Sequence, residues 1–264
     1  MNHREAGRYW DGNAEAWSEL SRAGYNTSRD RVLNPCFFRM LPDVHGLAGL
    51  DIGCGDGDNT RLVATRGASM TGLDIAPCFT AIAEQTERAD PIGVRYLCAS
   101  AVELPFADES FDFAVAFASL MDVPEFACAL AEAHRVIRPG GFLQFSITHP
   151  CCDVPRRRKV RDDEGNMVAM ELAGYFAGSS GAVLEWIFGA APPEERAKYP
   201  LFRQPQLHHT LSEWLNALAE VGFHVEKAEE PRASESVLSQ FPEEKDTHMW
   251  PYFLIMRCRK TAPR

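Results

Sequence analysis

The stretch Leu50-Asp51-Ile52-Gly53-Cys54-Gly55-Asp56-Gly57 is the segment from which the fold can be inferred. A short apolar run from Leu47 to Ile52 predicts a buried strand, and helical spacing resumes from Asn59 to Thr65. Closely spaced glycines after a strand let the backbone turn sharply under a ligand, and the following helix offers free backbone N–H groups. The segment therefore predicts a strand, a ligand-binding loop and a helix in succession.

Strands and helices continue to alternate after this loop. The apolar patterns predict four further strands and one further helix: Ser69–Leu73, Val94–Leu97, Phe111–Phe117 and Gly141–Ile147 as strands, and Glu125–Val136 as a helix. Strands separated by helical segments of about ten residues imply right-handed crossovers. The pattern is therefore typical of a parallel sheet that is covered by helices on both faces.

The alternation stops after Pro150. Residues 151–207 contain a basic run at 156–159, turn residues and short apolar patches, and we interpret them as an insertion over one end of the sheet. Regular patterns then return as a helix that Gly222 ends, two strands, and a polar loop between the strands: Leu211–Val221, Phe223–Lys227, Tyr252–Arg259 and the loop 232–250.

Composition and charge exclude several classes of protein. The 264 residues are 45% hydrophobic, and 27 Lys plus Arg stand against 37 Asp plus Glu, a net charge of -10. An acidic surface disfavours general binding to nucleic acids or anionic membranes, and no run approaches the ~18 apolar residues of a membrane span. The polar N-terminus lacks the pattern of a signal peptide, and the eight cysteines are scattered. We expect reduced thiols and a cytoplasmic protein.

Asp74 ends the second predicted strand, where a carboxylate can accept hydrogen bonds from both hydroxyls of a ribose. Together with the glycine loop it indicates a cofactor of the adenosine type at the switch point of the sheet. Asp51 and Asp56 flank the glycines, and their charges repel the pyrophosphate of a dinucleotide such as NAD. S-adenosylmethionine carries a sulfonium and an ammonium group and therefore suits this loop better.

The run Leu50–Gly57 resembles motif I of the class I S-adenosylmethionine-dependent methyltransferases, and the branch that acts on small molecules, similar to the quinone-biosynthesis enzymes, resembles it most. Further segments match in the order of the family: Gly72–Ile75, Leu104–Phe106, Ser110–Asp112, Arg135–Gly141 and the helix that ends before Phe223. The resemblance implies a doubly wound, Rossmann-like α/β fold with a seven-stranded, mostly parallel sheet whose last strand is antiparallel. It also implies S-adenosylmethionine as cofactor, with S-adenosylhomocysteine as the product.

We expect a single domain over residues 1–264. Within it, residues 1–46 form an N-terminal helical lid and 47–150 the cofactor-binding core. Residues 151–207 form a substrate cap, and 208–264 complete the core. The segments outside the shared core are expected to select the substrate.

The resemblance also implies the residues that contact the cofactor. Gly53 and Gly55 would underlie the methionine moiety, Asp74 would hold the ribose and Ile75 would pack on adenine. Ser100 and Ala101 stand beside the adenine where relatives often carry Asp-Ala-Glu, and Arg29 is either a partner for the cofactor carboxylate or a solvated helix-end arginine. The complete expected set is Arg29, Asp51, Gly53, Gly55, Asp74, Ile75, Ser100, Ala101 and Phe117.

Methyl transfer requires alignment and exclusion of water, and a hydroxyl acceptor also benefits from a general base. His149 at the end of the fifth strand and Asp122 after the fourth are the candidate catalytic residues. A structural histidine and a helix-capping aspartate are the alternatives. His208 and His209 either reach the same cleft or are structural. The adjacent pair Cys151-Cys152 lacks the usual spacing of metal ligands, so no metal site is predicted.

We expect the substrate to be a small molecule, and the sequence leaves the oligomeric state and the acceptor atom open. A methyltransferase acting on tRNA or protein is disfavoured by the acidity and by the absence of an Asn-Pro-Pro-Tyr motif. A non-catalytic module that binds the cofactor would be expected to lose motif I or Asp74, and an NAD-dependent oxidoreductase disagrees with the acidic loop.

Overall fold

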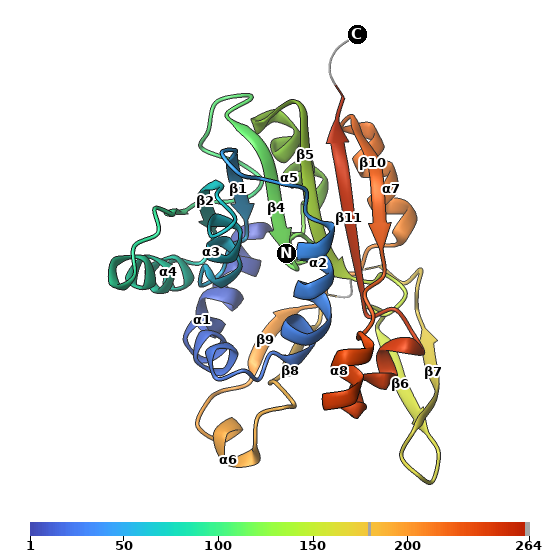
Figure 1. Cartoon of the computed structure of the whole chain (residues 1–264). Helices are drawn as coiled ribbons and strands as arrows, with labels where there is room; N and C mark the ends of the chain where they lie inside the picture. Colours follow the sequence, from blue (N-terminus) through green and yellow to red (C-terminus); the bar gives the residue numbers. More distant parts are fainter. Residues whose placement is uncertain (179–180, 262–264) are drawn as a thin grey trace.

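A seven-stranded sheet forms the centre of the computed structural model, which describes residues 1–178 and 181–261 (Figure 1). The strand order is β10-β11-β5-β4-β1-β2-β3. The strands are β1 (Ala48–Ile52), β2 (Ser69–Asp74), β3 (Arg95–Cys98), β4 (Phe111–Phe117), β5 (Ile137–Thr148), β10 (Phe223–Glu229) and β11 (Phe253–Lys260). Strands β1 to β5 pair in parallel, and β11 lies antiparallel between β5 and β10. The expected α/β fold with an antiparallel last strand is confirmed.

Helices cover both faces of this sheet. The α-helices of the described residues are α1 (His3–Arg22), α2 (Asn34–Met40), α3 (Asp58–Ala64), α4 (Pro77–Ala89), α5 (Phe126–Val136), α6 (Pro193–Arg196), α7 (Leu211–Glu220) and α8 (Glu235–Gln240), of which α6 and α8 lie outside the faces of the sheet. Three shorter turns of other helical types are η1 (Arg29–Leu33), η2 (Leu120–Asp122) and η3 (Pro242–His248). No helix in residues 1–178 and 181–261 has both the length and the apolarity that a membrane span needs.

Strand β4 shows why the sequence favours a sheet that is buried on both faces. Its side chains alternate between two core layers, since Phe113 and Val115 pack with α2, α3 and α4, whereas Ala114 packs with α5 and α7. Trp214 of α7 is 2% exposed and belongs to the second layer. The near-continuous apolar run of β4 is the pattern expected for a parallel strand covered by helices on both faces.

Helix ends follow local chemistry. Helix α7 begins at a capping box in which the Thr210 hydroxyl accepts from the Glu213 N–H and the Glu213 carboxylate accepts from the Thr210 N–H. Gly222 follows the helix with φ of +94°, as the sequence predicts for a terminating glycine. The expected polar loop at 232–250 is wrong in part, because α8 and η3 occupy most of it. Polar residues with Ser234 as an N-cap form a short helix there.

The segment 151–207 forms two small two-stranded sheets. The first pairs β6 (Arg156–Arg161) with β7 (Met167–Ala173), and the second pairs β8 (Val183–Trp186) with β9 (Phe202–Pro205). The basic run lies on β6 and is exposed. Figure 1 shows the β8–β9 pair beside α1.

Aromatic side chains join α1 to the β8–β9 pair. The Trp17 ring lies 4.9 Å from Phe188 and 5.2 Å from Phe202, measured between ring centroids. Asn13 of α1 also bonds the edge of β9, donating to the Arg203 carbonyl at 3.0 Å and accepting from the Arg203 N–H at 2.9 Å. These two segments, far apart in the sequence, therefore share one apolar cluster.

Candidate functional site

A cavity of about 670 Å³ lies at the carboxyl ends of the central strands. The strand order reverses between β1 and β4, which is the position where open α/β sheets bind their ligands. The parts of the chain that line the cavity include the glycine loop, α1 and the residues that follow it, the turn after β4, and the β8–β9 pair.

The glycine loop forms the floor of this cavity. Gly53 has φ of +73°, and its N–H and that of Cys54 donate to the Leu73 carbonyl at 2.7 and 2.9 Å. A Cβ atom on Gly53 would lie 2.5 Å from the Cβ of Ser119, whose hydroxyl donates to the Ile52 carbonyl at 2.6 Å. Position 53 thus requires glycine both for its backbone conformation and for the close approach of the turn after β4.

Asp74 lies on the cavity wall at the end of β2 and is 8% exposed. One carboxylate oxygen accepts from the Gly55 N–H and the other from the Ala76 N–H, both at 2.9 Å. Burial raises the pKa of Asp74 to about 6, and these backbone hydrogen bonds oppose the rise. Each oxygen still has a lone pair to offer, so the side chain is fixed in place and can accept further hydrogen bonds.

Two more carboxylates face the same floor. Asp51 is 1% exposed, and its Oδ2 accepts from the Thr60 hydroxyl at 2.6 Å. Burial raises the pKa of Asp51 to about 7. Asp51 Oδ1 and Asp56 Oδ2 are buried without a hydrogen-bond partner among the described residues. Buried acceptors of this kind favour a ligand that brings donors or positive charge, and the ammonium and sulfonium groups of S-adenosylmethionine fit that requirement.

The other cofactor contacts expected from the sequence lie around the same cavity. Ile75 packs against Gly7 of α1, and the Phe117 ring lies 4.0 Å from Phe37 between centroids. Arg29 donates to Asp30 at 2.8 Å beside the cavity. The structure therefore brings all nine expected positions to one place: Arg29, Asp51, Gly53, Gly55, Asp74, Ile75, Ser100, Ala101 and Phe117. Their contact with the cofactor itself stays a prediction.

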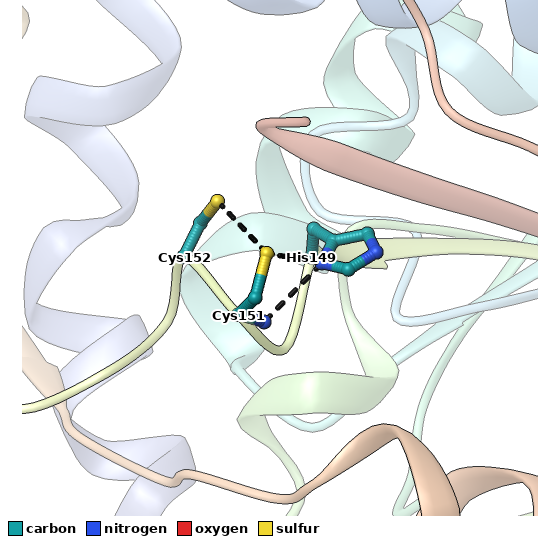
Figure 2. Close-up of side chains that lie close together, drawn as sticks. All are labelled: His149, Cys151 and Cys152. Carbon is teal, nitrogen blue, oxygen red and sulfur yellow. Dashed lines mark hydrogen bonds between the residues drawn. The ribbon is translucent and has the colours of Figure 1, made fainter. Parts of the chain in front are cut away.

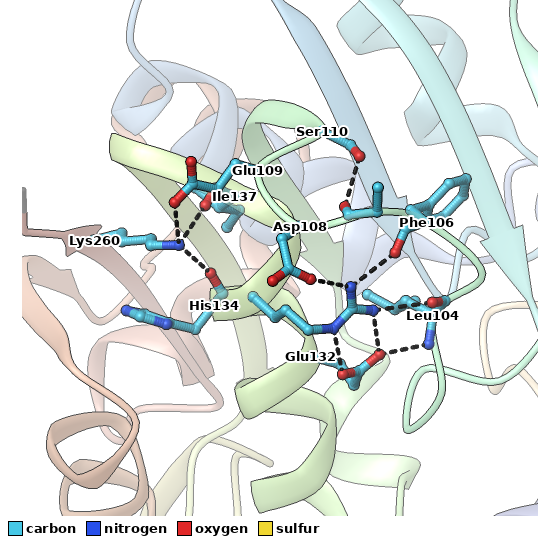
Figure 3. A network of polar contacts seen from close by, with 11 residues as sticks. Leu104, Phe106, Asp108, Glu109, Ser110, Glu132, His134, Ile137 and Lys260 are labelled. Atoms are coloured by element: carbon cyan, nitrogen blue, oxygen red, sulfur yellow. Dashed lines mark hydrogen bonds and ion pairs between the residues drawn. The ribbon is translucent and has the colours of Figure 1, made fainter.

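The loop that follows β3 and carries Ser100 and Ala101 is held by polar contacts to α5 (Figure 3). The Arg135 guanidinium donates to the carbonyls of Leu104 at 3.0 Å and Phe106 at 2.7 Å. Glu132 accepts from the Leu104 N–H at 2.8 Å. Arg135 therefore fixes the loop beside the cavity. The sequence placed Arg135 in a family motif but indicated no role for it.

Asp122 also lines the cavity and lies in η2, after β4. Its Oδ1 accepts from the Gln204 side-chain amide at 2.9 Å. Burial raises the pKa of Asp122 to about 8, and the hydrogen bond from Gln204 opposes the rise. The sequence did not identify Gln204 or Asp153, which also line the cavity, because no motif or periodicity marks them. Arg157, from the basic run at 156–159, lines the cavity as well.

The expectation that His149 faces the cavity is corrected. Thr148 lines the cavity, whereas its neighbour His149 does not, because successive side chains at a strand end point to opposite sides. The His149 imidazole instead lies 3.1 Å from Glu230 through Nε2. Burial lowers the pKa of His149, and Glu230 opposes that change.

Neither of the two later histidines lines the cavity. His208 is 2% exposed, and its Nε2 lies 2.6 Å from the Tyr175 carbonyl. The His209 ring packs on Phe126 at 4.3 Å and against Trp214. Both histidines therefore have a structural role, which the sequence left open as the alternative to a position in the cleft.

Comparisons with known proteins agree with this geometry. A family model described as "Methyltransferase domain" matches residues 50–145, the part that contains the glycine loop, Asp74 and the loop held by Arg135. A solved S-adenosylmethionine-dependent methyltransferase from Mesorhizobium loti is 29% identical, has a TM-score of 0.68, and aligns over 85% of this chain and 96% of its own. Residues 50–145 therefore belong to the methyltransferase domain of the class I S-adenosylmethionine-dependent enzymes.

Curated relatives match over the cofactor-binding part of this methyltransferase. An O-methyltransferase named cnsE from Penicillium expansum is 37% identical over 132 residues, 48% of each chain. The ubiquinone biosynthesis O-methyltransferase of Pseudomonas aeruginosa is 36% identical over 116 residues, 41% of this chain and 49% of its own. The chain thus aligns with about half the length of these relatives.

Proposed function

We propose that this methyltransferase transfers a methyl group to an acidic hydroxyl of a small molecule, with Asp122 as the general base. The observation that carries the proposal is the position of Asp122 on the cavity wall, in the turn after β4, with a pKa raised to about 8. A carboxylate of that basicity can accept the proton of a phenol-like hydroxyl near neutral pH. Relatives named O-methyltransferases support oxygen as the acceptor.

The residues of the chain perform three tasks in this proposal. S-adenosylmethionine, when bound, supplies a methyl group already activated by its sulfonium. Asp74, Asp51 and the glycine loop orient the cofactor, and the walls of the cavity exclude water. Gln204 holds Oδ1 of Asp122, which leaves Oδ2 to take the proton from the acceptor hydroxyl.

The walls of the cavity support a small, largely apolar substrate. Trp10, Trp17, Trp186 and Phe188 line it, and α1 and the β8–β9 pair cover it together. Aromatic walls of this kind pack well on a planar ring. We therefore propose a hydroxylated aromatic or conjugated molecule, in preference to the loops of a tRNA or protein.

We infer that the enzyme acts in the reducing environment of the cytoplasm. All eight cysteines are described, and none of them forms a disulfide. Unpaired thiols, several of them exposed, are typical of a reducing compartment.

A methyl-transfer screen tests the proposed function. The wild-type chain is incubated with methyl-labelled S-adenosylmethionine and a panel of phenols, aromatic amines and thiols, and the labelled product and S-adenosylhomocysteine are measured. We expect transfer to hydroxylated members and a turnover at least 100-fold lower in Asp122→Asn, with cofactor affinity unchanged. The matched control Asp163→Asn, at an exposed carboxylate, should equal wild type. Transfer to amines or thiols alone, or full turnover in Asp122→Asn, would contradict the proposal.

A further inference from the structure

Three side chains after β5 form a cluster outside the cavity lining: His149, Cys151 and Cys152 (Figure 2). The Cys151 sulfur lies 2.9 Å from His149 Nδ1 and 3.5 Å from the Cys152 sulfur. All three potential ligand atoms lie within 4.8 Å of one another. His149 and Cys152 are buried, and Cys151 is partly buried.

The hydrogen bonds around His149 select the tautomer that a metal requires. The Cys151 N–H donates to Nδ1 at 3.2 Å, so Nδ1 carries a lone pair. Nε2 lies 3.1 Å from Glu230 Oε1, and it therefore carries the proton that it donates to this carboxylate. A histidine that bonds a carboxylate through one nitrogen and presents the other nitrogen to a ligand is the usual arrangement at protein metal sites.

A tight turn holds the three residues in place before any ligand binds. The His149 carbonyl accepts from the N–H of Cys152 at 2.7 Å and from that of Asp153 at 3.0 Å. The His149 N–H donates to the Tyr252 carbonyl at 2.9 Å, which ties the turn to the residue before β11. These hydrogen bonds fix the backbone of the turn that carries the three side chains. The backbone therefore has little conformational entropy left to lose when a ligand binds.

We propose that His149 Nδ1, Cys151 Sγ and Cys152 Sγ bind a thiophilic divalent ion, Zn²⁺, with a fourth position open to water or a small ligand. Two thiolates and an imidazole are a donor set that suits Zn²⁺. With bond lengths of about 2.3 Å to sulfur and 2.0–2.1 Å to nitrogen, tetrahedral ligands lie roughly 3.5–3.8 Å apart. The sulfur–sulfur distance of 3.5 Å must open by roughly 0.3 Å, and the nitrogen–sulfur distance of 2.9 Å by roughly half an ångström or more.

Proton and charge balance are satisfied at this site. Each thiol releases one proton to solvent on binding, and two thiolates neutralise the charge of Zn²⁺, which makes a buried site tolerable. Binding breaks two hydrogen bonds: that from the Cys152 thiol to the Pro251 carbonyl, 2.5 Å long, and that from the Cys151 N–H to His149 Nδ1. The sequence does not predict this site, because adjacent cysteines lack the usual spacing of metal ligands. In the folded chain the turn brings the three ligand atoms together.

Occupancy of the site would stiffen one end of the cavity. The same turn continues into Asp153 and Arg157, which line the cavity, and Arg157 donates to the Cys152 carbonyl at 3.0 Å. The ion would therefore support substrate binding without contacting the cofactor.

Metal binding to the full chain tests this inference independently of activity. The protein is reduced, stripped with a chelator, and dialysed against Zn²⁺ for elemental analysis, and against Co²⁺ for its thiolate charge-transfer absorption. We expect one ion per chain, and at least a 100-fold loss of affinity in Cys151→Ser. Glu230→Gln should weaken binding about 10–100-fold through the orientation of His149. The matched control Cys128→Ser, at an exposed cysteine of α5, should bind as wild type does.

Thermal unfolding gives a second readout, because Cys152 is buried and its substitution can disturb folding. Excess Zn²⁺ should raise the unfolding midpoint of wild type and Cys128→Ser but not of Cys151→Ser. Less than one ion per chain in wild type, no thiolate absorption with Co²⁺, or equal affinity in Cys151→Ser would overturn the inference.

Discussion

The Gln204 side-chain amide donates to Asp122 Oδ1 across 2.9 Å, which joins β9 of the 151–207 segment to the turn after β4. The two residues are 82 positions apart, and both line the cavity. This hydrogen bond directs the candidate base. The orientation of Asp122 in the cavity therefore depends on the packing of the 151–207 segment against the central sheet.

The pH dependence of turnover should report Asp122. Because its pKa is raised to about 8, the carboxylate form that accepts a proton is the minor form at pH 7. We expect the turnover number to rise with pH and level off above about pH 8, and the rise should be absent from the residual activity of Asp122→Asn. Measurement at saturating cofactor across pH 6 to 9, to be compared with Asp163→Asn, checks this prediction. A flat wild-type profile would contradict it.

Stability should depend on the same titration. The Asp122 carboxyl has its ordinary pKa of 3.8 in the unfolded chain, and burial raises this pKa to about 8 in the folded protein. Between these values the folded state holds the extra proton, so this group makes the free energy of unfolding fall as pH rises from about 4 to 8. Urea titrations should show a shallower fall in Asp122→Asn than in wild type. Parallel curves would argue against the raised pKa.

Asp74→Ala should weaken cofactor binding at least tenfold, or about 1.4 kcal/mol, in calorimetry with S-adenosylmethionine. The change removes the acceptor for the Gly55 and Ala76 N–H groups as well as for the cofactor hydroxyls. Asp74→Asn keeps one acceptor oxygen and should lose less affinity. The control Asp163→Ala removes an exposed carboxylate outside the cavity and should bind normally. Unchanged affinity in Asp74→Ala would show that the ribose contact is misplaced.

Gly53→Ala and Gly140→Ala separate backbone strain from close contact. Both glycines have positive φ, +73° and +80°, but a Cβ at position 140 meets nothing within 4 Å. We expect Gly140→Ala to cost about 1–2 kcal/mol of unfolding free energy and to keep its cofactor affinity. Gly53→Ala adds a 2.5 Å contact with Ser119, so it should cost more and also lower affinity. Equal effects of the two substitutions in urea unfolding and calorimetry would contradict this interpretation.

Gly7 and Gly12 provide a similar pair within α1. Alanine at Gly12 meets nothing within 4 Å and should stabilise the helix by roughly 0.5–1 kcal/mol. At Gly7 the new Cβ would lie 2.9 Å from Ile75 Cγ2, so we expect no gain in unfolding free energy and weaker cofactor binding. If both variants were equally stabilised and bound S-adenosylmethionine alike, α1 would not pack on Ile75 as described.

The sequence by itself determined the sheet, its order of elements and the cofactor end of the cavity. The limits of β4 agree with the prediction, and Gly53, Gly55 and Asp74 lie where the pattern placed them. These features follow from local physics, since period, turn glycines and strand ends depend on residues that are close in the chain. The parallel topology then brings those strand ends to one edge of the sheet.

Only the tertiary structure decided the substrate end. Neighbouring side chains at a strand end point to opposite sides, so a shift of one residue in the register would exchange them. In the folded chain Thr148 lines the cavity and His149 lies beside Glu230. The pairing of Asp122 with Gln204, and the apolar cluster shared by α1 and β8–β9, join segments that no local pattern relates. Contacts between such distant segments depend on packing of the whole chain, and that is why the substrate end could not be predicted.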